Sequence, residues 1–293
     1  MKDEDVAPIP PYPHSPVWPV TDLVIFDCDN TLSHVEGIDE LARLTGTHED
    51  VAALTHRAMS GEVRLESVYS RRLTMSNPTQ AQVGYLRRVY RENVIADARE
   101  VIAALHDLGG RAFIVSGGLI EPVRDFGAWL GIPRDRIFAV ETEYDQLAGE
   151  WWRYWEQPGG QNPDANYLAV KDNPLTGTGG KAQVIDRIRQ RHPGRAMLIG
   201  DGYSDLEAQA HVDLFVGFGG VVYREKMSLA APVYIKTPHL APIVPLALGR
   251  VGNRPPWRYL FADGLQRIES GEVTFRDEAM RESFLSALRR TVG

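Results

Sequence analysis

The stretch LVIFDCDNT, residues 23–31, decides the fold. Residues 23–28 form a short run that is largely apolar and β-branched, which predicts a strand buried on both faces of a sheet. Asp27 and Asp29 fall where that strand ends. Because ligands of an open parallel sheet bind beyond the carboxyl ends of its strands, this pair of carboxylates indicates a functional site.

The rest of the chain alternates between the same kind of strand and amphipathic helices. Further strands are predicted at residues 112–115, 137–140, 196–199 and 214–216, and helices at 97–109, 120–130 and 182–191. This alternation predicts an α/β fold with a doubly wound, mostly parallel sheet.

One block of the chain departs from this alternation of strands and helices. Val35, Ile38, Leu41 and Leu44 recur at helical spacing, and a long helical stretch follows. We therefore expect a small helical domain inserted after the first strand. The expected organisation is an extended, proline-rich lead-in (1–21), an α/β core (22–34 and 97–249), a helical cap (35–96) and a C-terminal extension (250–293).

Composition limits the partners and the compartment. Hydrophobic residues make up 43% of the 293 residues, and the formal net charge of −7 argues against a nucleic-acid-binding surface. No run approaches 18 apolar residues, so we expect no membrane span. A single cysteine, Cys28, and a proline-rich N-terminus without a signal peptide favour a reducing, cytoplasmic location.

A second pair of acids follows the strand predicted at 196–199. In the motif GDGYSD, residues 200–205, Asp201 and Asp205 are bracketed by glycines, a pattern typical of Mg²⁺ ligation. The alternative interpretation is that Asp205 caps a helix. Likewise Asp27 and Asp29 could attack phosphorus and shuttle a proton, or could form a solvated acidic turn.

Two glycine-rich motifs add candidate phosphate ligands. Ser116, Gly117 and Gly118 follow a predicted strand and precede a helix, where backbone N–H groups can approach a phosphate. Gly179-Gly180-Lys181 opens the helix at 182–191, a position where an ammonium opposes the helix dipole. A bound phosphate would compensate that cost.

The order and the amino-acid sequences of these motifs resemble those of a known family. The stretches FDCDNTLSHVEGIDELARLTG (26–46), HRAMSGEV (56–63), SRRL (70–73), VSGG (115–118), GGK (179–181), IGDGYSDLEA (199–208) and FVGFGG (215–220) are similar to those of the phosphoserine phosphatases of the haloacid dehalogenase superfamily. The resemblance covers most of residues 22–236. It implies a Rossmann-like core and Mg²⁺-dependent hydrolysis of O-phospho-L-serine, the last step of serine biosynthesis.

The same resemblance implies catalytic and metal-binding roles. Asp27 would be the nucleophile that becomes phosphorylated, and Asp29 the acid and base. Mg²⁺ would be held by Asp27, Asp201 and the backbone carbonyl of Asp29, with Asp205 supporting the site.

The substrate-binding residues are also implied. Glu36 would bind the ammonium group of the substrate and Arg72 its carboxylate. The remaining substrate-site positions are Met59, Ser116, Gly117, Gly118, Lys181, Ser204 and Arg224.

Several departures from the family pattern leave alternatives open. Asn30 and Ser60 replace residues usual in the family, and residues 149–178, with Trp151, Trp152, Tyr154 and Trp155, form a longer insertion than the family's hairpin. The alternatives are a phosphatase or phosphotransferase acting on another small phosphomonoester, and a non-catalytic phosphate-binding protein.

The C-terminal extension has no counterpart in the resemblance. Its last predicted helix carries Met280, Phe284, Leu285 and Leu288 on one face. Such a face has to be buried, either against the parent domain or against a second subunit, which would make the protein a homodimer.

Overall fold

A seven-stranded sheet forms the centre of the computed structural model, which describes residues 18, 20–59, 65–147, 152, 156 and 162–289, with the backbone alone at 56–59 and 65–67. The strand order is β3-β2-β1-β6-β7-β8-β9, parallel throughout except for the antiparallel β8–β9 pair. The strands are β1 (Leu23–Phe26), β2 (Arg111–Leu119), β3 (Ile137–Val140), β6 (Ala196–Gly200), β7 (Leu214–Phe218), β8 (Val233–Ile235) and β9 (Val273–Phe275).

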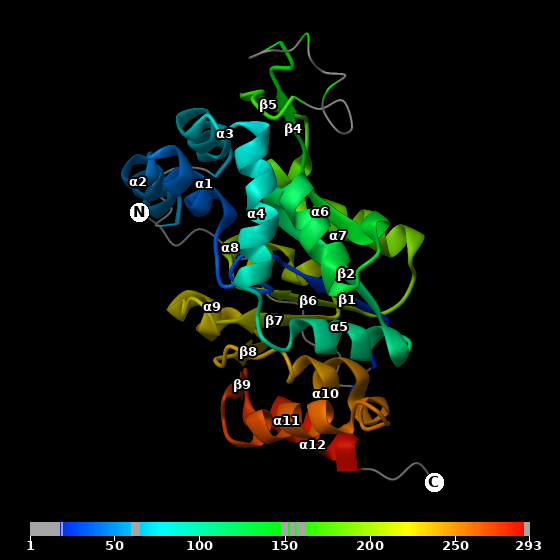
Figure 1. Ribbon diagram of the computed structural model, residues 1–293. Coiled ribbons are helices and arrows are strands. Elements are labelled where there is room, and N and C mark those ends of the chain that lie inside the picture. Colours follow the sequence, from blue (N-terminus) through cyan, green and yellow to red (C-terminus); the bar gives the residue numbers. More distant parts are fainter. Residues whose placement is uncertain are drawn as a thin grey trace, which may run out of the picture.

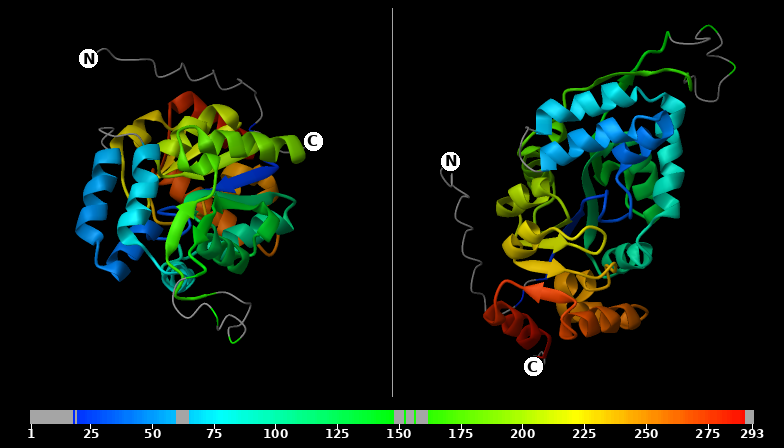
Figure 2. Two further views of the ribbon diagram at one scale, coloured as in Figure 1. Left: turned by 90° about the horizontal axis from the view of Figure 1, so that it is seen from above. Right: turned by 90° about the vertical axis from the view of Figure 1, so that its left-hand side faces the viewer.

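Helices cover both faces of this sheet. Helix α7 (Gly180–Arg191) lies on one side. Helices α5 (Ala98–Asp107) and α6 (Ile120–Leu130) lie together on the other, where α10 (Ile243–Leu248) packs against α5 (Figure 1 and the left-hand view of Figure 2). Every residue of β1 is buried, as a central parallel strand requires. The prediction of a doubly wound, mostly parallel α/β fold is therefore confirmed.

Four helices separate β1 from α5 in the chain. They are α1 (Gly37–Thr45), α2 (His48–Met59), α3 (Leu65–Ser76) and α4 (Gln80–Glu92). They gather at one end of the molecule, as the right-hand view of Figure 2 shows. A capping box between Thr79 and Gln82 starts α4, which then packs along α6.

A two-stranded hairpin, β4 (Thr142–Tyr144) and β5 (Tyr167–Val170), projects beside these helices (Figure 1). The backbone N–H of Gln80 donates to the carbonyl of Ala165 (2.8 Å), and that of Tyr167 to the carbonyl of Pro78 (2.8 Å). The hairpin is thus attached to the turn between α3 and α4. Of the predicted aromatic cluster, Trp152 is exposed, whereas 151, 154 and 155 lie outside the described residues.

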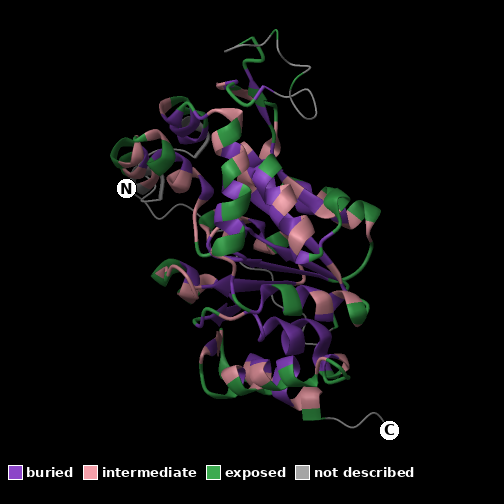
Figure 3. Ribbon diagram, in the orientation of Figure 1, coloured by how far each residue is buried: buried purple, intermediate pink, exposed green. Residues whose placement is uncertain are grey.

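The C-terminal segment lies at the opposite end of the molecule (Figures 1 and 3). It contains α11 (Arg258–Glu269), β9 and α12 (Glu278–Arg289), and β9 extends the sheet at β8. Phe284 of α12 packs edge-on against Trp18 with a ring-centroid separation of 5.0 Å, and the Trp18 indole donates to the carbonyl of Leu246.

This packing resolves the question raised by the amphipathic tail helix. Met280, Phe284 and Leu285 are buried, and Leu288 is partly buried against the same core. The apolar face of α12 is therefore covered by its own chain. The remaining short helices are α8 (Tyr203–Glu207) and α9 (Glu225–Ala230), and none of the described helices has the length and apolarity to cross a bilayer.

Candidate active site

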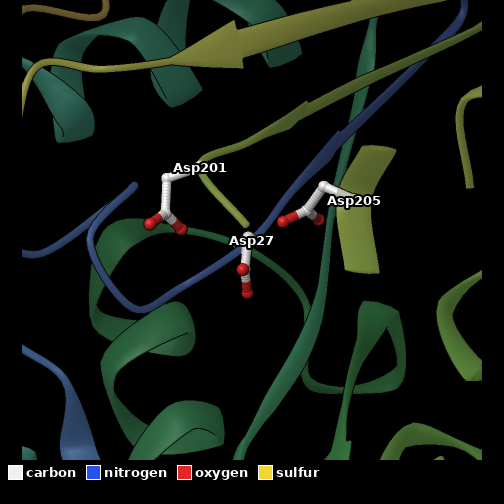
Figure 4. A group of neighbouring side chains, drawn as sticks. All are labelled: Asp27, Asp201 and Asp205. Atoms are coloured by element: carbon white, nitrogen blue, oxygen red, sulfur yellow. The ribbon is translucent and has the colours of Figure 1, made fainter. Parts of the chain in front are cut away.

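Three buried carboxylates converge at the carboxyl ends of the central strands. Asp27 follows β1, Asp201 follows β6, and Asp205 lies in α8, with ligand oxygens within 4.8 Å of one another (Figure 4). The pairing of β1 with β6 brings them together: the Asp27 N–H donates to the carbonyl of Ile199 at 2.9 Å. The two acidic motifs, far apart in sequence, thus share one site.

The charges of this cluster require compensation. The pKa of Asp201 is raised to about 7, chiefly by burial and also by the nearby Asp27, while Arg224 opposes the shift. Burial likewise raises the pKa of Asp205 above its usual range, although Lys181 opposes the shift. Carboxylate oxygens converging in this way are the ligands that a hard divalent cation prefers, so the residues fit a metal ion.

Lys181 supplies one positive charge within the cluster. Its Nζ lies 2.7 Å from Asp27 Oδ2 and 2.7 Å from Asp205 Oδ1. Burial alone would lower the pKa of Lys181, but Asp205 and Asp27 raise it above its usual range. The ammonium therefore stays protonated, and these two acids offset the unfavourable helix-terminal position predicted for it.

Asp205 is not the N-cap that the alternative interpretation assigned to it. It lies within α8, which Gly202 caps, and its Oδ2 accepts the Gly202 N–H at 3.2 Å. Its other oxygen binds Lys181. Asp205 thus joins the start of α8 to the acid cluster.

Asp29 points toward the inserted helices. Its Oδ1 accepts hydrogen bonds from the Tyr90 hydroxyl at 2.6 Å and from the Gly37 N–H at 3.3 Å. Burial raises the pKa of Asp29 to about 7, the Tyr90 hydrogen bond opposes the shift, and Asp27 adds to it. A carboxyl group with this pKa can both donate and accept a proton near neutrality.

The Ser116–Gly118 motif differs from its predicted setting. It was expected in a turn after a strand ending at 115, but β2 continues through it to Leu119, and α6 begins only at Ile120. The register of β2 against β3 shifts between Val115 and Leu119. Ser116 is buried, and its Oγ accepts the Gly118 N–H at 3.0 Å.

A small cavity beside Asp29 carries two of the predicted substrate residues, Glu36 and Arg72. Arg72 is buried and donates from Nη1 to Thr55 Oγ1 at 3.2 Å, while its buried Nε has no partner among the described residues. Burial raises the pKa of Glu36 to about 8, with Asp29 adding to the shift and Arg72 opposing it. Glycines 117 and 118 also line this cavity.

The other predicted substrate positions are placed differently. Arg224 binds Asp201, with Nε 3.1 Å from its backbone oxygen and Nη2 3.1 Å from Oδ2, and lines a second, open cavity with Glu36. Ser204 lies in α8 and lines neither cavity. The side chain of Met59 lies outside the described residues.

Two tyrosines at the site were not predicted. Tyr90 binds Asp29, and the Tyr69 hydroxyl donates to the carbonyl of Gly117 at 2.7 Å. Both rings are buried, so in the sequence they are indistinguishable from helical core residues. The helical spacing of apolar residues predicts that both rings are buried, but it does not predict which polar group each hydroxyl contacts.

Comparison with known proteins agrees with this geometry. The family model of haloacid dehalogenase-like hydrolases matches residues 24–209, and the chain belongs to that family. Within it, the chain groups with the phosphoserine phosphatases. The human phosphoserine phosphatase is 32% identical over 215 residues, which are 73% of this chain and 88% of the human protein.

Two further comparisons extend the same similarity. The phosphoserine phosphatase of Drosophila melanogaster is 33% identical over 218 residues, covering 73% of this chain and 74% of the fly protein. A phosphoserine phosphohydrolase-like protein from Francisella tularensis has a similar fold, with a TM-score of 0.62 at 23% identity over 74% of this chain and 95% of the other. The family resemblance seen in the sequence motifs is confirmed.

Proposed function

We propose that this protein is a Mg²⁺-dependent phosphomonoester hydrolase that converts O-phospho-L-serine and water to L-serine and phosphate. The proposal rests on the observation that two features of the site lie next to each other. Asp27 sits in a buried cluster of acids with Lys181, and the neighbouring cavity at Asp29 presents Glu36 and Arg72. The similarity to the human and fly phosphoserine phosphatases supports this substrate.

In this proposal the acid cluster holds the metal. Asp27, Asp201 and the backbone carbonyl of Asp29 would be its ligands, and Asp205 would support them. When bound, Mg²⁺ would offset the negative charge of the acids and of the phosphoryl group. Arg224 keeps the Asp201 carboxylate oriented through its contact at 3.1 Å.

The chain's own groups carry two proposed steps. First, a carboxylate oxygen of Asp27 attacks phosphorus, the bond to the serine oxygen breaks, and Asp29 gives that oxygen a proton. Next, Asp29 takes a proton from water, and the water oxygen attacks phosphorus, so that phosphate leaves and the Asp27 carboxylate is restored. Lys181, Ser116 and the backbone of Gly117 and Gly118 would bind the phosphate oxygens.

The amino-acid end of the substrate is proposed to lie in the cavity under the helices. The partnerless Nε of Arg72 is a buried donor that a substrate carboxylate would satisfy. An ammonium group beside Glu36 would offset the repulsion between Glu36 and Asp29. The carboxylate and the ammonium group of O-phosphoserine would then each lie beside a group of opposite charge.

We further propose that residues 35–96 act as a cap on a core formed by 22–34 and 97–249, with 1–21 and 250–293 as additions. The bond from Tyr69 to Gly117 supports this division, because it joins the cap to the phosphate-binding segment. A closed cap would exclude bulk water during the reaction.

A panel of phosphomonoesters tests the substrate directly. Phosphate release from O-phospho-L-serine, O-phospho-L-threonine, phosphoethanolamine and phosphoglycolate would be measured with Mg²⁺ and with a chelator. We expect the largest kcat/KM for O-phospho-L-serine and no turnover with the chelator. A larger kcat/KM for phosphoglycolate, which lacks the amino group, would contradict the assignment.

A further inference from the structure

Tyr90 of α4 reaches the proposed acid and base from outside the recognised motifs. Its ring is 1% exposed, and its hydroxyl donates to Asp29 Oδ1 over 2.6 Å. A buried tyrosine hydroxyl needs a partner, and a carboxylate is a strong acceptor. The contact joins the inserted helices to the residue that would move the proton.

The position of Tyr90 is fixed by the core and does not depend on substrate. Its ring stacks on Phe126 of α6, with a centroid separation of 5.4 Å and an interplanar angle of 19°. The next residue, Arg91, pairs with Asp125 of α6 at 2.6 Å. The hydroxyl is therefore held in place before a ligand binds.

The two oxygens of Asp29 have different surroundings. Oδ1 accepts from Tyr90 and from the Gly37 N–H. A Cβ built on Gly37 would lie 2.3 Å from the Tyr90 oxygen, so the absence of a side chain at 37 is what admits the hydroxyl. Oδ2 faces the phosphate-binding segment, since a Cβ on Gly118 would lie 3.4 Å from it.

We infer that Tyr90 is a positioning residue, which holds Asp29 by Oδ1 so that Oδ2 is the oxygen that exchanges the proton. The inference rests on the proposed function. During the first step, Oδ2–H would protonate the leaving serine oxygen, and during the second Oδ2 would accept a proton from water. Tyr90 itself neither gains nor loses a proton in either step.

The variant Tyr90→Phe tests this assignment because it removes the hydroxyl and keeps the buried ring. With Mg²⁺ and O-phospho-L-serine we expect kcat to fall about 10- to 100-fold, the range for a lost hydrogen bond to a charged group, with KM unchanged. Tyr85→Phe is the matched control. Tyr85 lies on the same helix with its side chain exposed, and we expect wild-type kinetics.

A second readout separates positioning from a general structural effect. With p-nitrophenyl phosphate the phenolate leaves without a proton, so the first step should not need Asp29 to be oriented. We expect Tyr90→Phe to keep a fast burst of p-nitrophenol, followed by slow turnover limited by water attack. A burst slowed as much as kcat for O-phosphoserine would overturn the assignment, as would a kcat within about twofold of wild type.

The same measurements keep the two proposals apart. A wild type that hydrolyses other alkyl phosphates but not O-phospho-L-serine would overturn the substrate assignment. The comparison of Tyr90→Phe with Tyr85→Phe would then be made on the alkyl phosphate that is hydrolysed, and would still decide the role of Tyr90.

Discussion

The centre of the sheet and its β9 edge are built from opposite kinds of side chain. At the carboxyl ends of β1 and β6, Asp27, Asp201 and Asp205 are buried close together. At the β9 edge of the sheet, Trp18, Phe275 and Phe284 form an aromatic cluster. Buried like charges destabilise a fold unless ligands compensate them, whereas buried aromatic rings stabilise it. The comparison predicts that variants in the central acid cluster change activity, whereas variants in the aromatic cluster at the β9 edge change stability.

The largest effect is expected for Asp27→Asn. Removing the proposed nucleophile should reduce phosphate release more than about a thousandfold, because the groups of such a site act as one unit. Thermal unfolding should show a folded protein. Residual turnover above about one part in a thousand would contradict the covalent mechanism.

Phe284→Ala tests the aromatic cluster at the β9 edge of the sheet. This ring is fully buried against Trp18 and Phe275, so its loss should cost about 3–5 kcal/mol of unfolding free energy. Denaturant unfolding would measure the loss, and kcat of the folded protein should stay unchanged. A folded variant with wild-type stability and no activity would show that the tail reaches the active site.

Glu36→Gln tests the specificity assigned to the cap. Replacing one partner of a buried, charge-assisted contact should cost O-phospho-L-serine about 2–5 kcal/mol in transition-state binding. Phosphoglycolate, which has no ammonium group, should lose much less. The ratio of kcat/KM in the variant to that in the wild type would be measured for each substrate. An equal loss of kcat/KM for both would make Glu36 a structural residue.

The last prediction is a pH dependence of the stability of the metal-free protein. Burial raises the pKa of Asp201 to about 7 in the folded state, above its usual unfolded value near 4. Between these values the folded chain binds more protons than the unfolded chain, so stability should fall as the pH rises from about 4 to 7. Melting curves with chelator would show this fall, which Asp201→Asn should reduce and Mg²⁺ should offset.

The sequence predicts the acid cluster at the centre of the sheet well, because the signals for it are local. An apolar strand followed by an acid is recognisable from consecutive residues, and parallel pairing then brings Asp27 next to Asp201. The predicted helix at 120–130 and strand at 137–140 coincide with α6 and β3. The family resemblance supplied the roles that the local signals left open.

What the sequence missed depends on contacts between distant residues. Ser116-Gly117-Gly118 has the composition of a turn, yet pairing extends β2 through it to Leu119. The three residues of β9 carry too little periodicity to reveal a strand, which exists because it pairs with β8. Tyr90 lies 61 positions from Asp29, and no period in the sequence connects them.

The most direct test of the central claim is to trap the phosphorylated enzyme. Protein turning over O-phospho-L-serine with Mg²⁺ would be quenched in acid and its peptides examined by mass spectrometry. We predict one phosphoryl group on Asp27 in the wild type and none in Asp27→Asn. Steady phosphate release with no phosphoryl group on Asp27, or with one on a different residue, would contradict the account.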